Sequence, residues 1–283
     1  HNLRTAFEYN LNDKDHLNIA YTGSFTPDQY SNSLTSGNYQ ASNVDKYVET
    51  RMHNVTLQYH SGVGFDVGGD YTHYTSDNNQ TLLADYADGG QSSFSIIGGQ
   101  KIDRYSIYAD RKRHLAKEWN LGYGISYRFA KDRDFQTYDK VTGDIPTENT
   151  DSRLREQSAN FYVSLSRNYA TGTSVSVSAT GEYYAIGSYR KWAVYPQASL
   201  TYVKSPKHLF QLSLSTDKTY PGYWDMQSSV SHLNGYTELW GTPGLKPSTT
   251  YNLNGNYIWK QKYIFGLFFM HTSDFFVQTG YQS

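Results

Sequence analysis

The sequence of 283 residues contains no cysteine and only seven prolines. Without cysteine, the chain has no disulfide scaffold, no thiol nucleophile and no cysteine-ligated zinc. No stretch approaches the ~20 consecutive apolar residues that a membrane-spanning helix needs, which excludes a helical membrane protein. The net charge of −1 provides no basic surface, so nucleic acid is not expected as a partner.

Aromatic residues are abundant, with 28 Tyr, 13 Phe and 5 Trp. These side chains suit a pleated, half-buried surface, so the composition favours strands over helices. The mean hydropathy of −0.69 is low for a membrane protein. A transmembrane strand, however, needs only every second residue to be apolar, and the low mean is therefore compatible with a β-barrel.

The clearest periodic segment runs from Trp119 to Ala130. Large apolar residues alternate there with small or polar ones over about the ~9–11 residues that a tilted strand needs to cross a bilayer. The apolar set is Trp119, Leu121, Tyr123, Ile125, Tyr127 and Phe129. This pattern predicts that one side of the strand contacts hydrocarbon and the other contacts water or protein.

The same alternation recurs and predicts about twelve strands, arranged as six hairpins with tight turns. The predicted pairs are 3–10 with 17–24, 55–60 with 65–72, 102–110 with 119–130, 161–165 with 175–183, 198–202 with 210–214, and 251–259 with a strand from 263. Aromatic residues cluster beside these turns and predict an interfacial girdle. They are Tyr9, Tyr59, Phe65, Trp119, Tyr169, Tyr202, Phe210, Trp259 and Tyr263.

Most connections between the hairpins are long. We expect loops at Thr26–Val48, Thr75–Gln91, Asp132–Glu156 and Asp217–Ser248, whereas Ala185–Lys191 is brief. Alternating short and long connections are typical of outer-membrane barrels, which have short periplasmic turns and long extracellular loops. The sequence therefore predicts an all-β fold, an antiparallel transmembrane β-barrel of meandering strands.

One segment resembles a known family. Its residues are Tyr220-Pro221-Gly222-Tyr223-Trp224, then Leu233, Asn234 and Tyr236, then Gly241-Thr242-Pro243-Gly244-Leu245-Lys246-Pro247-Ser248. Together they resemble the late barrel region of TonB-dependent receptors and, more narrowly, of Bacteroidetes outer-membrane barrel proteins. The family motif would comprise Gly241, Pro243, Leu245, Lys246 and Pro247. Thr242 and Ser248 depart from the family pattern, which usually has Asn and Glu there.

The resemblance implies a 22-stranded barrel, an N-terminal plug with a TonB box, and energy-coupled import of a scarce ligand. Neither the plug nor the TonB box is recognisable in the sequence. We therefore expect residues 1–283 to form a single outer-membrane barrel domain, incomplete at both ends. The expected partners are outer-membrane lipid, the TonB complex acting through a plug outside this chain, and a small-molecule, peptide or glycan ligand.

Clustered aromatic rings are the candidate ligand contacts, because such rings stack on sugars and apolar surfaces. The candidates are Tyr220, Tyr223, Trp224, Tyr236 and Trp240. Packing of the loop against itself would explain the same residues equally well. A non-transporting barrel, such as a passive pore, an adhesin or an assembly scaffold, is the alternative function.

Catalysis, metals and cofactors are not expected. The nine histidines show no metal-binding spacing, and acidic pairs such as Asp13 and Asp15 lie in turns. An outer-membrane lipase is the enzymatic alternative, but no serine and histidine stand out as a pair with an orienting partner. The sequence thus predicts a protein that is not an enzyme.

Overall fold

The computed structural model describes residues 1–37, 40–143, 148–234 and 237–279. Twelve antiparallel strands form one sheet in which each strand pairs with its neighbours in the chain, except that β10 pairs with β13. The strands are β1 (Asn2–Asn10), β2 (His16–Gly37), β3 (Gln40–Ser61), β4 (Phe65–Asp85), β5 (Gln91–His114), β6 (Trp119–Thr142), β7 (Thr150–Asn168), β8 (Ser174–Ile186), β9 (Tyr189–Ser205), β10 (His208–Thr219), β13 (Ser248–Trp259) and β14 (Tyr263–Ser273).

The six predicted hairpins are confirmed. They are β1–β2, β3–β4, β5–β6, β7–β8, β9–β10 and β13–β14. In the hairpin with the clearest alternation, Ile125 faces Ala109 and Tyr127 faces Ile107. The all-β class and the number of strands in the main sheet also agree with the prediction.

Three of the four expected long loops are mostly strand. β2 continues to Gly37, and β3 begins at Gln40. Only residues 86–90 lie between β4 and β5, and β6 extends to Thr142. The prediction of loops at Thr26–Val48, Thr75–Gln91 and Asp132–Glu156 is therefore wrong, because most of these residues are in strands. Ser, Thr, Asn and Asp occupy many positions on both faces there, so the strands continue without an apolar row that marks them in the sequence.

The two faces of the sheet differ as the alternation predicts. On β6, Ile125 and Tyr127 are 59% and 41% exposed, whereas Gly124 is buried and Ala130 is fully buried. Aromatic rings also line up across neighbouring strands on the exposed face. Phe210 lies 4.6 Å from Tyr257, measured between ring centroids. The convex face thus presents apolar and aromatic side chains outwards, as expected of a side that contacts lipid.

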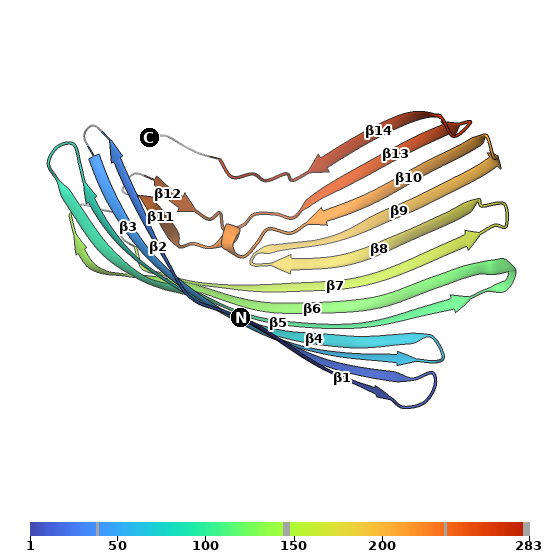
Figure 1. Cartoon of the computed structure of the whole chain (residues 1–283), viewed down its shortest axis with the longest axis horizontal. Coiled ribbons are helices and arrows are strands. Elements are labelled where there is room, and N and C mark those ends of the chain that lie inside the picture. The colour runs from blue at the N-terminus through green and yellow to red at the C-terminus, as the bar shows by residue number, and fades with distance from the viewer. Residues whose placement is uncertain (38–39, 144–147, 235–236, 280–283) are drawn as a thin grey trace.

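The long connection between β10 and β13 does not extend away from the sheet. Its described residues, 220–234 and 237–247, are called here the inner segment, and the sheet curves around them (Figure 1). The segment contains a small second sheet, β11 (Val230–Asn234) with β12 (Thr237–Trp240), which the sequence did not predict. β11 contacts β2, β3 and β4. The concave face that carries the inner segment is called the inner face.

The described helices, η1 (Ala116–Glu118) and η2 (Trp224–Met226), have three residues each and are too short to span a membrane. Two buried apolar clusters lie on the inner face. One contains Leu82 and Phe94 from β4 and β5. The other joins Tyr184 of β8 to Met226 of η2, so the inner segment contributes to a core that the sheet alone would leave open.

Candidate ligand site

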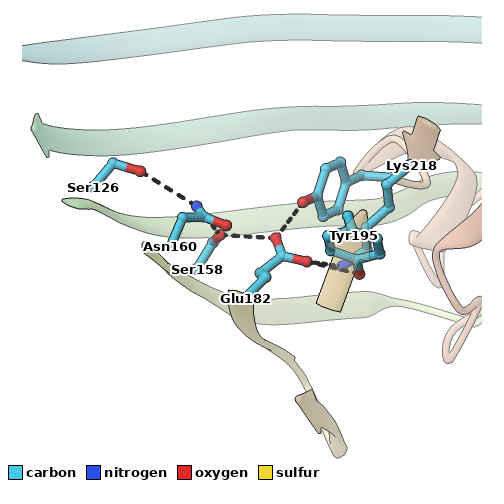
Figure 2. A network of polar contacts seen from close by, with 7 residues as sticks. Ser126, Ser158, Asn160, Glu182, Tyr195 and Lys218 are labelled. Atoms are coloured by element: carbon cyan, nitrogen blue, oxygen red, sulfur yellow. Dashed lines mark hydrogen bonds and ion pairs between the residues drawn. The ribbon is translucent and has the colours of Figure 1, made fainter. Parts of the chain in front are cut away.

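The inner segment begins at a buried carboxylate on β8. Glu182 is 1% exposed, and its oxygens accept hydrogen bonds from Ser158 Oγ and Tyr195 Oη, both at 3.1 Å. Lys218 Nζ and the Tyr220 hydroxyl donate to the same carboxylate. Figure 2 shows Ser158, Tyr195 and Lys218 converging on Glu182. Because four donors from four other chain positions satisfy this carboxylate, it fixes the start of the inner segment to the wall.

The network continues in both directions across the inner face. Asn160 Nδ2 donates to Ser158 Oγ at 3.1 Å and to Ser126 Oγ at 3.3 Å, which links β6 to β7 (Figure 2). Lys218 Nζ lies 4.4 Å from the Tyr184 ring centroid and 4.5 Å from that of Tyr220. Aromatic faces and a carboxylate together compensate for the buried ammonium group.

Tyr223 makes a second attachment to the wall. Its hydroxyl donates to Glu156 Oε2 on β7. Burial, reinforced by the Glu156 carboxylate, raises the pKa of Tyr223 well above its usual value. The phenol therefore stays protonated and remains a donor at any physiological pH.

A third attachment joins β11 to β6 and β4. The side-chain amide of Gln136 pairs with Val230: Gln136 Nε2 donates to the Val230 carbonyl, and the Val230 N–H donates to Gln136 Oε1, both at 2.8 Å. Gln80 Nε2 donates to the His232 carbonyl. These side-chain amides form hydrogen bonds with backbone groups of β11, as a neighbouring strand would, and so hold β11 to the wall.

The His232 ring packs against Phe94 of β5 and Tyr138 of β6, and the residue is 5% exposed. Its ring centroid lies 4.6 Å from that of Phe94, and Nε2 shares a hydrogen bond of 2.9 Å with Tyr138 Oη. Burial lowers the pKa of His232 below its usual 6.5, although Glu238, 3.4 Å away, opposes this shift. The docked hairpin therefore favours the neutral imidazole.

Acidification should loosen the β11–β12 hairpin. Because the docked form has the lower pKa, docking is strongest above pH 6.5 and weakens as the pH falls below that value. Spin labels on single cysteines at Leu233 and Leu83 can measure the distance between hairpin and wall, since the chain has no native cysteine. We expect a broader distance distribution at pH 5 than at pH 8. The same broadening in His232→Gln would show that His232 is not responsible.

The family-motif residues fold the end of the inner segment back towards the sheet. A β-carbon on Gly241 would collide with the backbone of Gln227, and the Thr242 N–H donates to the Asp225 carbonyl at 2.7 Å. Leu245 packs against the Tyr184 cluster, and Pro247 is buried just before β13. Pro243 and Lys246 are exposed. In this structure the motif thus brings two parts of the inner segment together.

The predicted ligand residues separate into two groups. Tyr220 and Tyr223 point into the wall and donate to Glu182 and Glu156, so their hydroxyls serve attachment. Trp224 and Trp240 are 41% and 66% exposed. Tyr236 lies outside the described residues.

Trp224 and Trp240 line one pocket of about 280 Å³. The polar residues Asp225 and Gln227 also line it, as do residues 276–278. The pocket combines two large apolar rings with a few polar groups, which is the usual character of a small-molecule site. This pocket is the candidate ligand site.

Sequence reasoning missed the wall residues that position this site. Glu156, Glu182 and Gln136 face inwards from the sheet, whereas the strands were predicted from apolar residues that face outwards. A signal was present for Glu182, because an acidic residue in the middle of a strand pattern is costly to bury without a partner. The sequence did not indicate that Lys218 and Tyr220 would be that partner.

Among solved structures, P. aeruginosa FpvA bound to a heterologous pyoverdine–iron complex aligns with 90% of this chain and 38% of its own, at 13% identity and a TM-score of 0.53. The siderophore receptor PirA from Pseudomonas aeruginosa aligns over 96% and 55% of the two chains, at 8% identity and a TM-score of 0.43. The hemophore receptor HasR of Serratia marcescens aligns over 90% and 50%, at 9% identity and a TM-score of 0.43. No curated protein sequence matches the chain.

The likeness to FpvA is a likeness of fold, and the chain spans 38% of the length of that protein. The expected resemblance to TonB-dependent receptor barrels is confirmed at this level. The sequence profile of the outer membrane protein beta-barrel family matches residues 59–283. Because this match covers most of the chain, the protein is a β-barrel protein of the bacterial outer membrane and belongs to the outer membrane protein beta-barrel family.

Proposed function

We propose that the chain forms part of the wall of a TonB-dependent outer-membrane transporter that imports a scarce ligand. The observation that carries this proposal is the inner segment, which is attached to the inner face and holds the Trp224 and Trp240 pocket there. A segment held across the lumen in this way would restrict passive diffusion. A transporter needs a site that retains its ligand before import.

We also propose that residues 1–283 belong to a single barrel of about 22 strands. In the described sheet, β1 and β14 are edges without a partner strand. Unpaired backbone groups are strongly unfavourable in hydrocarbon, so spanning strands occur in closed barrels. Further strands alongside β1 and β14 would satisfy these edges.

The proposed partners follow from the same function. Outer-membrane lipid would cover the convex face, and the TonB complex would act through a plug domain outside this chain. FpvA, which shares the fold, is described in complex with pyoverdine and iron. The proposed ligand of this chain is a small molecule, peptide or glycan, and the proposal assigns no catalytic step to the chain.

Growth under limitation of single nutrients tests the transport proposal. A strain that lacks the full-length gene should grow more slowly when one nutrient is scarce, and the intact gene should restore growth only where TonB is functional. Trp240→Ala should reduce growth without lowering the amount of protein in the outer membrane, because its indole is 66% exposed and lines the proposed ligand pocket. Restoration of growth in the absence of TonB would contradict energy-coupled import.

A non-transporting barrel, such as an adhesin or assembly scaffold, is the second candidate. One observation favours it: β6 has 24 residues, more than twice the ~9–11 that a strand needs to cross the bilayer, so the wall projects far beyond the membrane. Loss of surface attachment in the deletion strain, with normal growth on every scarce nutrient, would support this alternative over transport.

A further inference from the structure

A second, polar pocket of about 160 Å³ lies between the inner face and the inner segment. Asn78 of β4, Gln100 of β5 and Asp134 of β6 line it from the wall. Trp224 and Ser229 line it from the inner segment. None of these wall residues takes part in the attachments described above.

Two adjacent wall positions in the lining of the pocket, Gly98 and Gly99 of β5, lack a side chain. Gly98 of β5 stands in register between Asn78 of β4 and Gln136 of β6. A β-carbon there would lie 3.2 Å from the carbonyl oxygens of both Asn78 and Phe135. Any larger residue would therefore crowd the backbone at this part of the pocket wall.

Two acceptors in this pocket have no donor. Asp134 Oδ1 and Asn78 Oδ1 are buried and make no hydrogen bond within the described part of the chain, and Gln100 Nε2 is a buried donor that makes none either. Asp134 is 4% exposed, and no lysine, arginine or histidine among the described residues forms an ion pair with it. Leaving such a buried acceptor unpaired costs about 1–3 kcal/mol, and more when the group is charged.

Glu182 provides an internal comparison. Both carboxylates are buried on the inner face, but Glu182 receives Lys218 and three hydroxyl groups from the chain itself. Asp134 has the neighbouring Ser229 as a side-chain donor, and its Oδ1 is buried without a hydrogen bond in the described part of the chain. Lys218 therefore provides an ammonium group to Glu182, whereas Asp134 has no ion-pair partner among the described residues.

Trp224 lines both this polar pocket and the pocket that contains Trp240. A molecule that spans the two would place a polar head beside Asp134 and an apolar body against the indoles. A cation beside an indole face also gains from the ring quadrupole. A ligand with a charged end and an apolar end would suit this arrangement.

We propose that the polar pocket binds the protonated amine of the imported ligand, with Asp134 and Asn78 accepting its hydrogen bonds and Trp224 beside it. This inference rests on the proposed transport function and names the chemical class of the ligand. An ammonium group has three donors and no acceptor, which matches the two unpaired acceptors, whereas the unpaired donor Gln100 Nε2 would need an acceptor elsewhere on the ligand. A hard metal ion takes six or more oxygen ligands, and one carboxylate lines this pocket beside amide and hydroxyl groups, so calcium is tested as a competing occupant.

Calorimetry on the full-length protein in detergent tests the proposal. The probes are phenethylammonium, its uncharged counterpart 2-phenylethanol, N-acetyl-lysine amide as a peptide-like amine, and calcium chloride alone. We expect phenethylammonium to bind and 2-phenylethanol to bind at least about tenfold more weakly, because a buried charge-assisted hydrogen bond is lost. Tighter binding of N-acetyl-lysine amide would also support the proposal and would identify a peptide as the source of the amine.

Three variants separate this site from general effects on folding. Asp134→Asn keeps the size of the side chain and removes its charge, and Gly98→Ala fills the pocket without changing charge. Each should weaken phenethylammonium binding by about tenfold or more. Asp77→Asn makes the same chemical change on an exposed residue of β4 and should leave binding unchanged. Folded protein is verified for each variant by circular dichroism.

Equal binding of the charged and neutral probes, unchanged binding in Asp134→Asn, or no amine binding at all would overturn the proposal. Calcium binding that Asp134→Asn abolishes, without amine binding, would replace it with a metal site. These outcomes are independent of uptake. Amine binding without TonB-dependent growth would contradict transport and leave the pocket assignment standing. TonB-dependent growth without amine binding would support transport and contradict the pocket assignment.

Discussion

Replacing Ile125 with arginine should reduce the stability of the folded barrel in a bilayer by about 2–4 kcal/mol. Ile125 is 59% exposed on the convex face, in the middle of the apolar row of β6. A charge at this position would have to stay in hydrocarbon or distort the surrounding lipid. Urea titration of the full-length protein folded into vesicles, followed by tryptophan fluorescence, measures the change.

The neighbouring position provides the control. Ser126 points to the inner face, where its Oγ accepts a hydrogen bond from Asn160. Ser126→Arg should therefore lower the free energy of unfolding far less than Ile125→Arg, because the guanidinium group can reach the aqueous lumen. Equal effects of the two substitutions would show that the convex face does not contact lipid.

Removing the Glu182 carboxylate should have a second large effect. In Glu182→Ala, Lys218 loses its counter-ion while remaining mostly buried, with 11% of its side chain exposed. Loss of one partner from a buried ion pair typically destabilises a protein by about 3–5 kcal/mol, because the other charge stays uncompensated. The same urea titration should show this decrease, together with faster proteolysis of the inner segment.

A double variant distinguishes loss of the ion pair from loss of packing. Glu182→Leu combined with Lys218→Met removes both charges and keeps similar volumes. Replacing both partners with apolar residues is often nearly neutral, so we expect the double variant to be more stable than Glu182→Ala. If the double variant were as unstable as Glu182→Ala, the three hydroxyl donors would account for the stability instead of the Lys218 ion pair.

The sequence was sufficient for the fold wherever one strand face contacts lipid. The apolar row around Ile125 has a period of two, and the short turns between such rows determine which strands pair. All six hairpins could therefore be predicted. The resemblance around Gly241 independently indicated the same barrel family.

The alternation became uninformative beyond the apolar rows. In β2, residues 28–37 are polar or small on both faces apart from Tyr30 and Leu34, so the sequence resembles a loop although the strand continues to Gly37. Backbone pairing with β3 maintains these residues as a strand. A single-strand pattern contains no information about such pairing.

The candidate site could be predicted only in part. Aromatic clustering identified Trp224 and Trp240, which do meet at one pocket. The attachments that place them there join positions far apart in the chain, such as Gln80 with His232 and Gln136 with Val230. Contacts of this kind depend on the curvature of the sheet, which the local sequence does not specify.

The attachments of the inner segment allow it to detach from the wall without unfolding of the sheet. Between β10 and β13 the segment runs across the inner face, and its contacts with Glu156, Gln136 and Gln80 are made by side chains of the wall. None of the backbone ladders that build the sheet passes through these contacts. The segment can therefore be released while every strand pair remains intact, at a free energy well below that of global unfolding. Hydrogen exchange at Val230 would then report on access to the lumen independently of the lifetime of the barrel.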